Sequence, residues 1–412
     1  MSATGVISAL TRFAEHWLSI WDPMHRRADH WPPEAWHEDL FNELALELAR
    51  LQYAHNPPYR RWCEARGIAP SRIDHWSRIP AVITSAFQEF EFSCLPPSHR
   101  SCVFYSSGTT RGKPSRHFHN SLTLRLYEAS LWWAFQKALL PEILSGPHPQ
   151  LVVLMPPPDQ APHSSLVYMA DTIRRQLGYS MDTFLGTADG TGLWHLDASR
   201  AWTRLRTLAE QGRPVLVLAT AYTLVQLLDT PGLTPHRIKL PPGSRVMETG
   251  GYKGRSRALT SDELYRWISE RWGLPLTSIV SEYGMCELSS QAYDSRFSQG
   301  DTQAPKVESE RTAQPRSATL RLRRKFRFPP WVRVQVIDPE TGTEAPHGRP
   351  GLLRIFDLAN VGSVLAIQTE DMAEALRDGF RLLGRATGTR PRGCSLLAAN
   401  GAERADSTDS HL

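Results

Sequence analysis

A short stretch near residue 110 concentrates side chains that could bind phosphate oxygens. Residues 105–117 read YSSGTTRGKPSRH, which combines neighbouring serine and threonine hydroxyls, two glycines and the cation of Lys113. Hydroxyl groups, open backbone N–H groups and a mobile cation suit the oxygens of a polyphosphate. The spacing does not match the GxxxxGK[ST] pattern of P-loop proteins, and an ordinary Ser/Gly turn is the alternative interpretation.

A second stretch could bind a nucleotide base and a metal ion. Residues 281–294 read SEYGMCELSSQAYD, with Tyr283 beside Gly284 and with Glu287 four residues after the tyrosine. Tyr283 could stack on a flat base, and Glu287 could bind a hard cation such as Mg²⁺. A strand end with a packed tyrosine is the alternative.

Two shorter elements follow towards the C-terminus. Asp371 ends the triplet TED, and Arg385 ends a Gly-Arg pair. A carboxylate such as Asp371 could accept hydrogen bonds from ribose hydroxyls, and Arg385 could donate one. Each element is unspecific alone, so its value lies in the order of all four along the chain.

In this order the four stretches resemble the adenylate-forming enzyme superfamily, which includes acyl-CoA ligases, firefly-type luciferase and adenylation domains. The closer resemblance is to its acyl-protein synthetase branch, the fatty-acid–protein ligase of bacterial luminescence, which is similar to phenylacetate–CoA ligase. Further segments carry this resemblance, from about residue 40 to residue 397: FNELALELARLQYAHNPPYRRWCEARG, IPAVITSAFQEFEF, GGYKGRSR and RGCSL.

The resemblance implies ATP and Mg²⁺ as cofactors and gives each matched residue a role. Glu287 would bind Mg²⁺ and would act in catalysis together with Lys113, while Asp371 and Arg385 would bind the ribose. His163, in APHSSLVYM, would lie at the edge of the acyl pocket. The residues implied for the β- and γ-phosphates are Ser106, Ser107, Gly108, Thr109, Thr110 and Lys113. Those implied for the adenine are Gly250, Gly251, Glu282, Tyr283 and Gly284.

Two positions depart from the superfamily pattern. The loop reads TTRGKP where TTGxP is common, so Arg111 adds a residue, and either Arg111 or Lys113 could reach the phosphates. Cys286 replaces the usual threonine of YGxTE, which removes a hydroxyl, and a thiol is a weaker hydrogen-bond donor. We interpret Cys286 as a small filler and not as a nucleophile.

Cys394 is the candidate acyl acceptor. Free cysteines often behave as small buried hydrophobes. Here Gly393 gives backbone freedom, and Arg390 and Arg392 place positive charge nearby, which favours the reactive thiolate. In the acyl-protein synthetase branch, the matched position in the RGCSL-like segment is the acylated cysteine, so the resemblance implies that role for Cys394.

The implied reaction has two steps. A carboxylic acid, fatty or aryl, attacks the α-phosphate of ATP to give acyl-AMP and pyrophosphate, and the acyl group then passes to a protein thiol. The resemblance implies hand-over to a partner such as a reductase or carrier. No lysine follows Lys325, so we expect no counterpart of the superfamily's C-terminal domain with its catalytic lysine. An acyl- or aryl-CoA ligase and a non-catalytic nucleotide-binding homologue are the alternatives.

The elements that must position these residues alternate in type. The apolar runs LVVLM (151–155), VLVLAT (215–220), SRVMETGG (244–251) and SIVSEYG (278–284) are separated by stretches with helical spacing. This alternation predicts an α/β fold of the adenylate-forming type, with parallel sheets flanked by helices. Thr260 and Glu263 have the spacing of a capping box before a helix at 261–272. Residues 331–338 and 351–358 predict a hairpin, and residues 363–368 a further strand.

We divide the chain into three regions. Residues 1–100 are expected to form a helical N-terminal region, and residues 101–385 the α/β core. Residues 386–412 are expected to form a short C-terminal segment with a disordered tail. Within the core, residues 298–318 almost lack large apolar side chains, which predicts a mobile surface loop.

Composition narrows the protein class. Hydrophobic residues at 41% and charged residues at 22% are typical of a soluble globular protein. The net charge is +5, but the arginines are scattered, so we expect no nucleic-acid partner; the densest run, at 320–328, is interpreted as a solvated or phosphate-facing strand edge. The five cysteines show no CxxC spacing, which indicates a reducing, cytoplasmic location without disulfides or zinc. The sequence has no apolar run that is long enough to predict a membrane span.

Overall fold

The computed structural model describes residues 3–25, 36–106, 113–140, 148–190, 192–230, 237–250, 259–294 and 324–386. Several predictions concern other residues: they lie outside the described residues and stay predictions. These are the phosphate-loop residues Ser107, Gly108, Thr109, Thr110 and Arg111, the adenine-side Gly251, the loop at 298–318, and Cys394 in the C-terminal segment.

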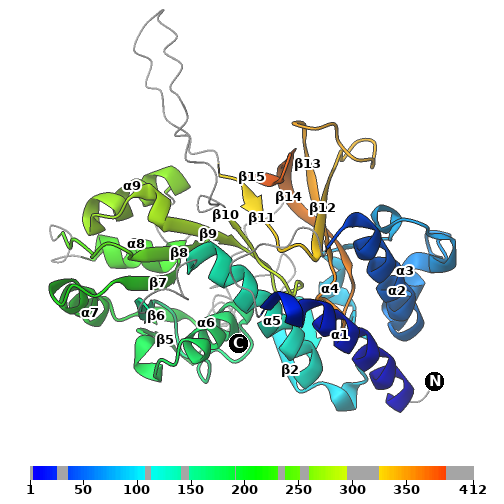
Figure 1. Ribbon diagram of the computed structural model, residues 1–412, viewed down its shortest axis with the longest axis horizontal. Helices are drawn as coiled ribbons and strands as arrows, with labels where there is room; N and C mark the ends of the chain where they lie inside the picture. The colour runs from blue at the N-terminus through cyan, green and yellow to red at the C-terminus, as the bar shows by residue number, and fades with distance from the viewer. Residues whose placement is uncertain are drawn as a thin grey trace, which may run out of the picture.

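One half of the main sheet is parallel and flanked by helices, as the sequence predicts. Its strands, in spatial order, are β4 (Gln150–Val153), β7 (Val215–Thr220), β8 (Arg245–Thr249) and β9 (Ile279–Tyr283). All residues of β4, β7 and β8 are buried, which requires cover on both faces. The helices that follow these strands include α6 (Ser165–Gln176), α7 (Ala198–Glu210), α8 (Ala221–Asp229) and α9 (Ser261–Trp272) (Figure 1).

Local capping explains where two of these helices begin. Helix α9 starts with the predicted capping box, in which the Thr260 side chain accepts from the Glu263 backbone and the Glu263 side chain accepts from the Thr260 backbone. Helix α8 starts directly after β7 with a capping box between Thr220 and Thr223. Because these caps satisfy the free backbone N–H groups at the helix start, each helix begins at a defined residue.

The other half of the sheet is antiparallel. From β9 it continues through β10 (Ala292–Asp294), β11 (Phe326–Arg327), β15 (Gly379–Arg385), β14 (Ala366–Leu376), β13 (Pro350–Asp357) and β12 (Val332–Ile337). The predicted hairpin is confirmed as β12–β13. The strand expected at 363–368 is longer and lies later in the chain. Since β14 pairs with both β13 and β15, the polar TED triplet lies within the strand and not after it.

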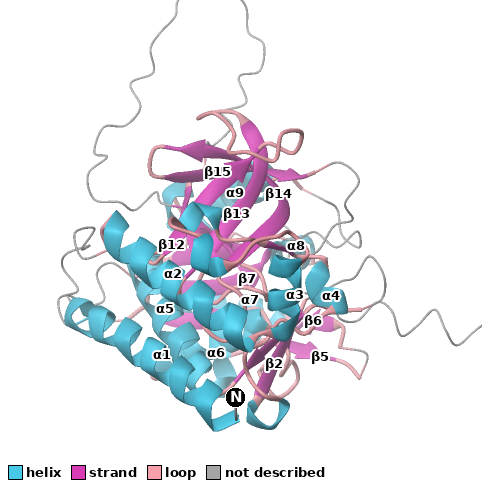
Figure 2. Ribbon diagram, turned by 90° about the vertical axis from the view of Figure 1, so that its right-hand side faces the viewer, coloured by secondary structure: helices cyan, strands magenta, loops and turns pink. Residues whose placement is uncertain are grey.

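The N-terminal region packs across the sheet and also joins it. Figure 2 shows α1 (Ala3–His25), α2 (Glu38–His55) and α3 (Pro57–Glu64) in front of the main sheet. After them, β1 (Val82–Ile83) pairs in parallel with β14. The remaining elements are α4 (Ala86–Glu89), the β2–β3 hairpin (Cys102–Tyr105 and Arg116–His119), α5 (Ser121–Leu139) and the β5–β6 pair (Gly186–Ala188 and Trp194–Leu196).

Two apolar cores hold these layers together. The smaller core lies among α7, α8, α9 and one face of the parallel strands, whereas the larger core joins α1, α2, α5 and α6 to the other face of those strands and to the antiparallel half. Trp132, Trp133 and Phe135 of α5 belong to the larger core, in line with their helical spacing. Within the described part of the chain, every helix is too short or too polar to cross a membrane.

Candidate functional site

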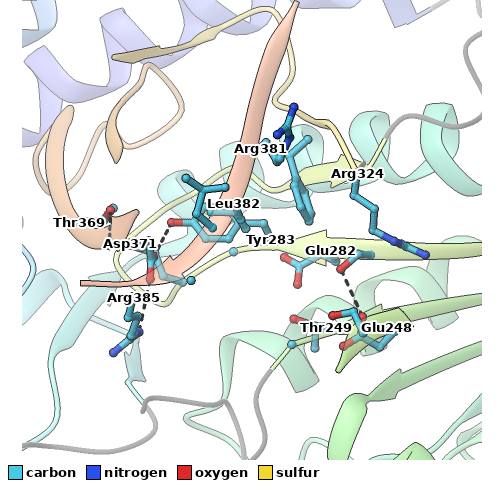
Figure 3. Close-up of a pocket in the computed structure, with 18 of the residues that line it drawn as sticks. Glu248, Thr249, Glu282, Tyr283, Arg324, Thr369, Asp371, Arg381, Leu382 and Arg385 are labelled. Carbon is cyan, nitrogen blue, oxygen red and sulfur yellow. Dashed lines mark hydrogen bonds and ion pairs between the residues drawn. The ribbon is translucent and has the colours of Figure 1, made fainter. Parts of the chain in front are cut away.

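A cavity of about 1280 Å³ opens where the two halves of the main sheet meet. The carboxyl ends of β8 and β9 form one wall and β14 and β15 another, as Figure 3 shows. Ligands of open α/β sheets commonly bind at the carboxyl ends of the strands. The cavity wall brings together eight of the predicted site residues: Ser106, Gly250, Glu282, Tyr283, Gly284, Glu287, Asp371 and Arg385.

Asp371 lies at one end of the cavity with both carboxylate oxygens in contact with protein groups. The Tyr283 hydroxyl donates to Oδ2 at 2.8 Å, and Arg385 Nε lies 3.4 Å from Oδ1. Asp371 and Arg385 face each other across β14 and β15, so strand pairing itself creates the ion pair. Burial and the nearby carboxylate raise the pKa of Tyr283 well above its usual value. Tyr283 therefore remains a hydrogen-bond donor at neutral pH.

The ring of Tyr283 is held by three phenylalanines. Its centroid lies 5.7 Å from that of Phe380, 6.2 Å from Phe326 and 6.1 Å from Phe328, in edge-to-face arrangements. Such pairs add to the stability gained from burial. The tyrosine is therefore a rigid part of the cavity wall before any ligand binds.

Two buried carboxyl groups, Glu282 and Glu248, line the cavity between β8 and β9. Burial raises the pKa of Glu282 to about 7, although a hydrogen bond from Thr249 opposes the shift. A Cβ atom at Gly284 would lie 2.4 Å from Glu282 Oε1, so the glycine leaves room for this carboxyl. Glu248, which sequence reasoning missed, accepts hydrogen bonds from Tyr265 and Ser281.

Arg324 differs from the interpretation of the basic run at 320–328, of which residues 324–328 are described. Lys325 and Arg327, in the same run, are partly exposed and pair with Asp378. Arg324 was expected on a solvated or phosphate-facing edge, but the side chain is 9% exposed and ion-paired with Asp294. Its guanidinium carbon lies 3.7 Å from the centroid of the Tyr265 ring. Arg324 also lines the cavity. An arginine with a buried carboxylate and an aromatic face available is stable inside the protein, and local charge density in the sequence does not reveal those partners.

Glu287 is the residue whose environment suits a metal ion. Its side chain is buried, and Oε2 accepts a hydrogen bond from Cys286 Sγ at 3.2 Å. Oε1 has no hydrogen-bond partner among the described residues. Those residues contain no group of three acidic, histidine or cysteine side chains that could hold a metal. One carboxylate fits Mg²⁺ nonetheless, because Mg²⁺ often binds one or two carboxylates together with substrate phosphates.

The predicted phosphate side is described only in part. Ser106 lies in the cavity wall and its hydroxyl accepts from the Ser115 backbone at 2.9 Å. Lys113 Nζ lies 3.9 Å from Glu89, and its side chain is 70% exposed. Among the described residues, the cavity wall does not include Lys113.

His163 is not part of the described cavity wall, but two of its neighbours are. Its Nδ1 donates to the Val103 carbonyl at 3.0 Å, and its ring lies 4.6 Å from that of Tyr105. Tyr105 and the next residue, Ser164, are both part of the cavity wall. Ser164 also caps α6, so the start of this helix fixes the place of His163.

Comparisons with known proteins find the fold but no sequence family. No protein-family model matches the chain, and no curated protein matches its sequence. The chain is similar to solved structures of 2-hydroxyisobutyryl-CoA ligase. One, in complex with 2-HIB-AMP and CoA in the thioesterification state, has a TM-score of 0.59 at 15% identity, with 87% of this chain and 69% of that chain covered.

Two other states of the same ligase are similar too. The open conformation with 2-HIB-AMP and CoA has a TM-score of 0.55 at 15% identity, covering 82% of this chain and 74% of that chain. The postadenylation state with 2-HIB-AMP has a TM-score of 0.59 at 14% identity, covering 87% and 70%. The chain therefore has the adenylate-forming-ligase fold that its sequence predicts.

Proposed function

We propose that the protein activates a carboxylic acid with ATP, forming acyl-AMP and pyrophosphate. The observation that carries this proposal is the cavity itself. It joins a buried carboxylate with one unpartnered oxygen, Glu287, to an Asp371–Arg385 pair on the opposite strands. A nucleoside triphosphate with its cation needs two such sites, one for the ion and one for the sugar.

Each end of the cavity has a proposed role. Asp371 and Arg385 hold the ribose, whose hydroxyls both donate and accept hydrogen bonds. Ser106 and the adjoining loop, with Lys113, hold the β- and γ-phosphates. His163 borders the acid. The adenine is assigned to Gly250, Gly251, Glu282, Tyr283 and Gly284.

Catalysis in this proposal comes from position and charge. Glu287 would hold Mg²⁺, which when bound offsets the charge that develops as pyrophosphate leaves. The protein's part is to align the carboxylate with the α-phosphate and to exclude water around them. The rigid Tyr283 ring and the buried Glu282 and Glu248 side chains keep the base end of the cavity fixed.

For the second step, we propose Cys394 as the acyl acceptor, with hand-over to a reductase or carrier. An acyl-CoA ligase is the second candidate. It is favoured by the likeness to a CoA ligase whose structures contain CoA. In both cases the thiol sulfur attacks the acyl carbonyl, the bond to the AMP phosphate oxygen breaks, and the thiol proton is released.

The first step is tested by exchange of labelled pyrophosphate into ATP with a panel of fatty and aryl acids. We expect exchange that depends on one class of acid. A folded protein that supports no exchange with any acid in the panel would refute the proposal.

The second step is tested by intact-protein mass spectrometry after incubation with ATP and the active acid. A hydroxylamine-sensitive acyl adduct is expected on the wild type and not on Cys394→Ser, while exchange persists in both. Acyl-CoA formed without any protein adduct would favour the CoA ligase. An adduct that persists in Cys394→Ser would exclude Cys394 as the acceptor.

A further inference from the structure

The turn that carries Glu287 is held by side chains from two distant segments. His117 of β3 donates from Nδ1 to the Cys286 carbonyl at 2.7 Å. Asn360 donates from Nδ2 to the Glu287 carbonyl at 2.8 Å. Asp357 accepts from the Ser289 backbone N–H at 2.9 Å. We call these three side chains the turn clamp.

The turn clamp is buried: His117 and Asn360 are 1% exposed and Asp357 is fully buried. Burial lowers the pKa of His117 to about 4, so the ring is neutral and holds its proton on the nitrogen that faces the carbonyl. Burial raises the pKa of Asp357 to about 6, so only the two donors, His117 and Asn360, keep the same charge throughout the neutral range.

Asn360 is itself anchored to the N-terminal region. Gln52 of α2 donates to the Asn360 carbonyl at 2.9 Å, and its side-chain oxygen accepts from the Leu365 backbone at 2.7 Å. Asn360 also donates to the Val364 carbonyl at 2.9 Å. The loop between β13 and β14 therefore has a fixed path, and the amide of Asn360 has a fixed direction.

The turn clamp explains how one oxygen of Glu287 can stay without a hydrogen-bond partner. Leaving a buried charged oxygen without a donor costs roughly 1–3 kcal/mol or more, so a mobile turn would rotate to give it a donor. The backbone N–H of Ser289, two residues along the same turn, is not available as a donor, because Asp357 accepts from it. His117 holds the carbonyl oxygen of Cys286 and Asn360 holds that of Glu287. The backbone is therefore fixed on both sides of the Glu287 side chain.

We infer that Asn360 and His117 are positioning residues that hold the turn of Glu287, and with it the unpartnered Oε1, at the cavity wall for the cation of a bound nucleotide. This inference rests on the proposed function, because it takes the cation to be part of a metal–nucleotide complex. Neither residue lines the described cavity wall, so each acts through the backbone of the turn. Groups that orient a metal ligand commonly change metal affinity 10- to 100-fold when they are removed.

The test compares Asn360→Leu with a matched control, Asn56→Leu. Asn56 is equally buried and donates to the Ser363 carbonyl at 3.1 Å in the same loop, but it has no hydrogen bond to the 286–290 turn among the described contacts. The readout is free Mn²⁺, measured by electron paramagnetic resonance in the presence of a non-hydrolysable ATP analogue. Thermal unfolding of both variants shows the loss of stability that they share.

We expect Asn360→Leu to weaken Mn²⁺ binding about tenfold and Asn56→Leu to change it less than twofold. His117→Phe, which keeps the ring but removes the donor, is expected to act like Asn360→Leu, and it serves as the test if Asn360→Leu does not fold. Equal Mn²⁺ binding by the control and both clamp variants would overturn this inference and leave the proposed function standing. A wild-type protein that binds neither the analogue nor Mn²⁺ would overturn the proposed function as well.

Discussion

Two parts of the cavity wall, around Asp371 and around Glu287, differ in how their carboxylates are partnered. Around Asp371, both carboxylate oxygens contact protein groups, Tyr283 and Arg385. Around Glu287, the carboxylate is more deeply buried and one oxygen has no partner among the described residues. The Asp371 carboxylate is thus fully partnered before a ligand arrives, whereas the Glu287 carboxylate has an electrostatic cost that a cation would offset. Substitutions in the two parts of the wall should therefore change different quantities.

The largest effect is expected for Glu287→Gln. Removing the charge should lower the turnover of acid-dependent pyrophosphate exchange roughly 100-fold, which corresponds to ~2.7 kcal/mol, because the cation would lose its protein ligand. The melting temperature should stay equal or rise, since a buried charge is removed. Exchange kinetics and thermal unfolding check both parts. Turnover equal to the wild type would remove the distinction between the two parts of the wall.

Asp371→Ala should act on affinity instead. The contacts with the ribose hardly change between the ground state and the transition state. Removing one should therefore weaken the binding of both states equally. We expect about tenfold weaker ATP binding, measured by calorimetry, with turnover at saturating ATP retained. Asp378→Ala is the control, because Asp378 pairs with Lys325 at 2.9 Å in the turn between the same two strands, and both residues lie outside the described cavity wall. A loss of turnover at unchanged affinity would contradict this assignment.

Glu282→Gln should change how stability depends on pH. Burial raises the pKa of Glu282 from its usual 4.5 to about 7, so the folded protein holds this proton more tightly than the unfolded chain. The contribution of Glu282 to stability is therefore fully present below pH 4.5 and is lost as the pH rises through 7.

The Glu282→Gln variant does not lose stability in this way, because its amide does not ionise. Its free energy of unfolding relative to the wild type should rise by up to ~3 kcal/mol between pH 4.5 and pH 8, measured by urea denaturation. Other titrating groups, such as His117 and Asp357, are common to both proteins, so the difference isolates Glu282. A difference that does not change with pH would mean that Glu282 has the same pKa in the folded protein as in the unfolded chain.

The smallest effect is expected for Lys113→Ala. Its contact with Glu89 is exposed, and such ion pairs contribute little to stability, so the melting temperature should not change. Turnover should fall less than in Glu287→Gln, by about two- to tenfold, if the lysine reaches a phosphate of the bound nucleotide. Turnover identical to the wild type, together with a loss in Arg111→Ala, would assign the phosphate contact to Arg111.

Local patterns predicted the parts of the molecule that depend on local physics. Alternating apolar runs and helical spacing located the parallel half of the sheet, and the spacing of Thr260 and Glu263 located the start of α9. The stretch around Tyr283 and Glu287 was singled out by its place in the order of four stretches, and its roles in binding a base and a cation stay predictions. The cavity brings these residues close to Asp371 and Arg385, although their spacing in the sequence gave no distance.

Long-range partners could not be predicted in this way. Glu248 reaches the cavity because β8 pairs with β9, which sets it opposite Ser281. His117 lies 169 positions from the carbonyl that it holds, and Asn360 lies 73 positions from Glu287. Arg324 looked solvated because its neighbours in the sequence are basic, while the carboxylate that pairs with it comes from β10. These side chains become recognisable only after the strands are paired.

The most direct test of the account follows the oxygen that would join the acid to the nucleotide. The protein is incubated with ATP, Mg²⁺ and an active acid labelled with ¹⁸O in its carboxyl group, and the released AMP is analysed by mass spectrometry. When the carboxylate oxygen attacks the α-phosphate and the acyl group later leaves, that oxygen remains on AMP. We expect AMP carrying one ¹⁸O atom for each turnover. AMP without ¹⁸O, or ADP as the nucleotide product, would contradict it.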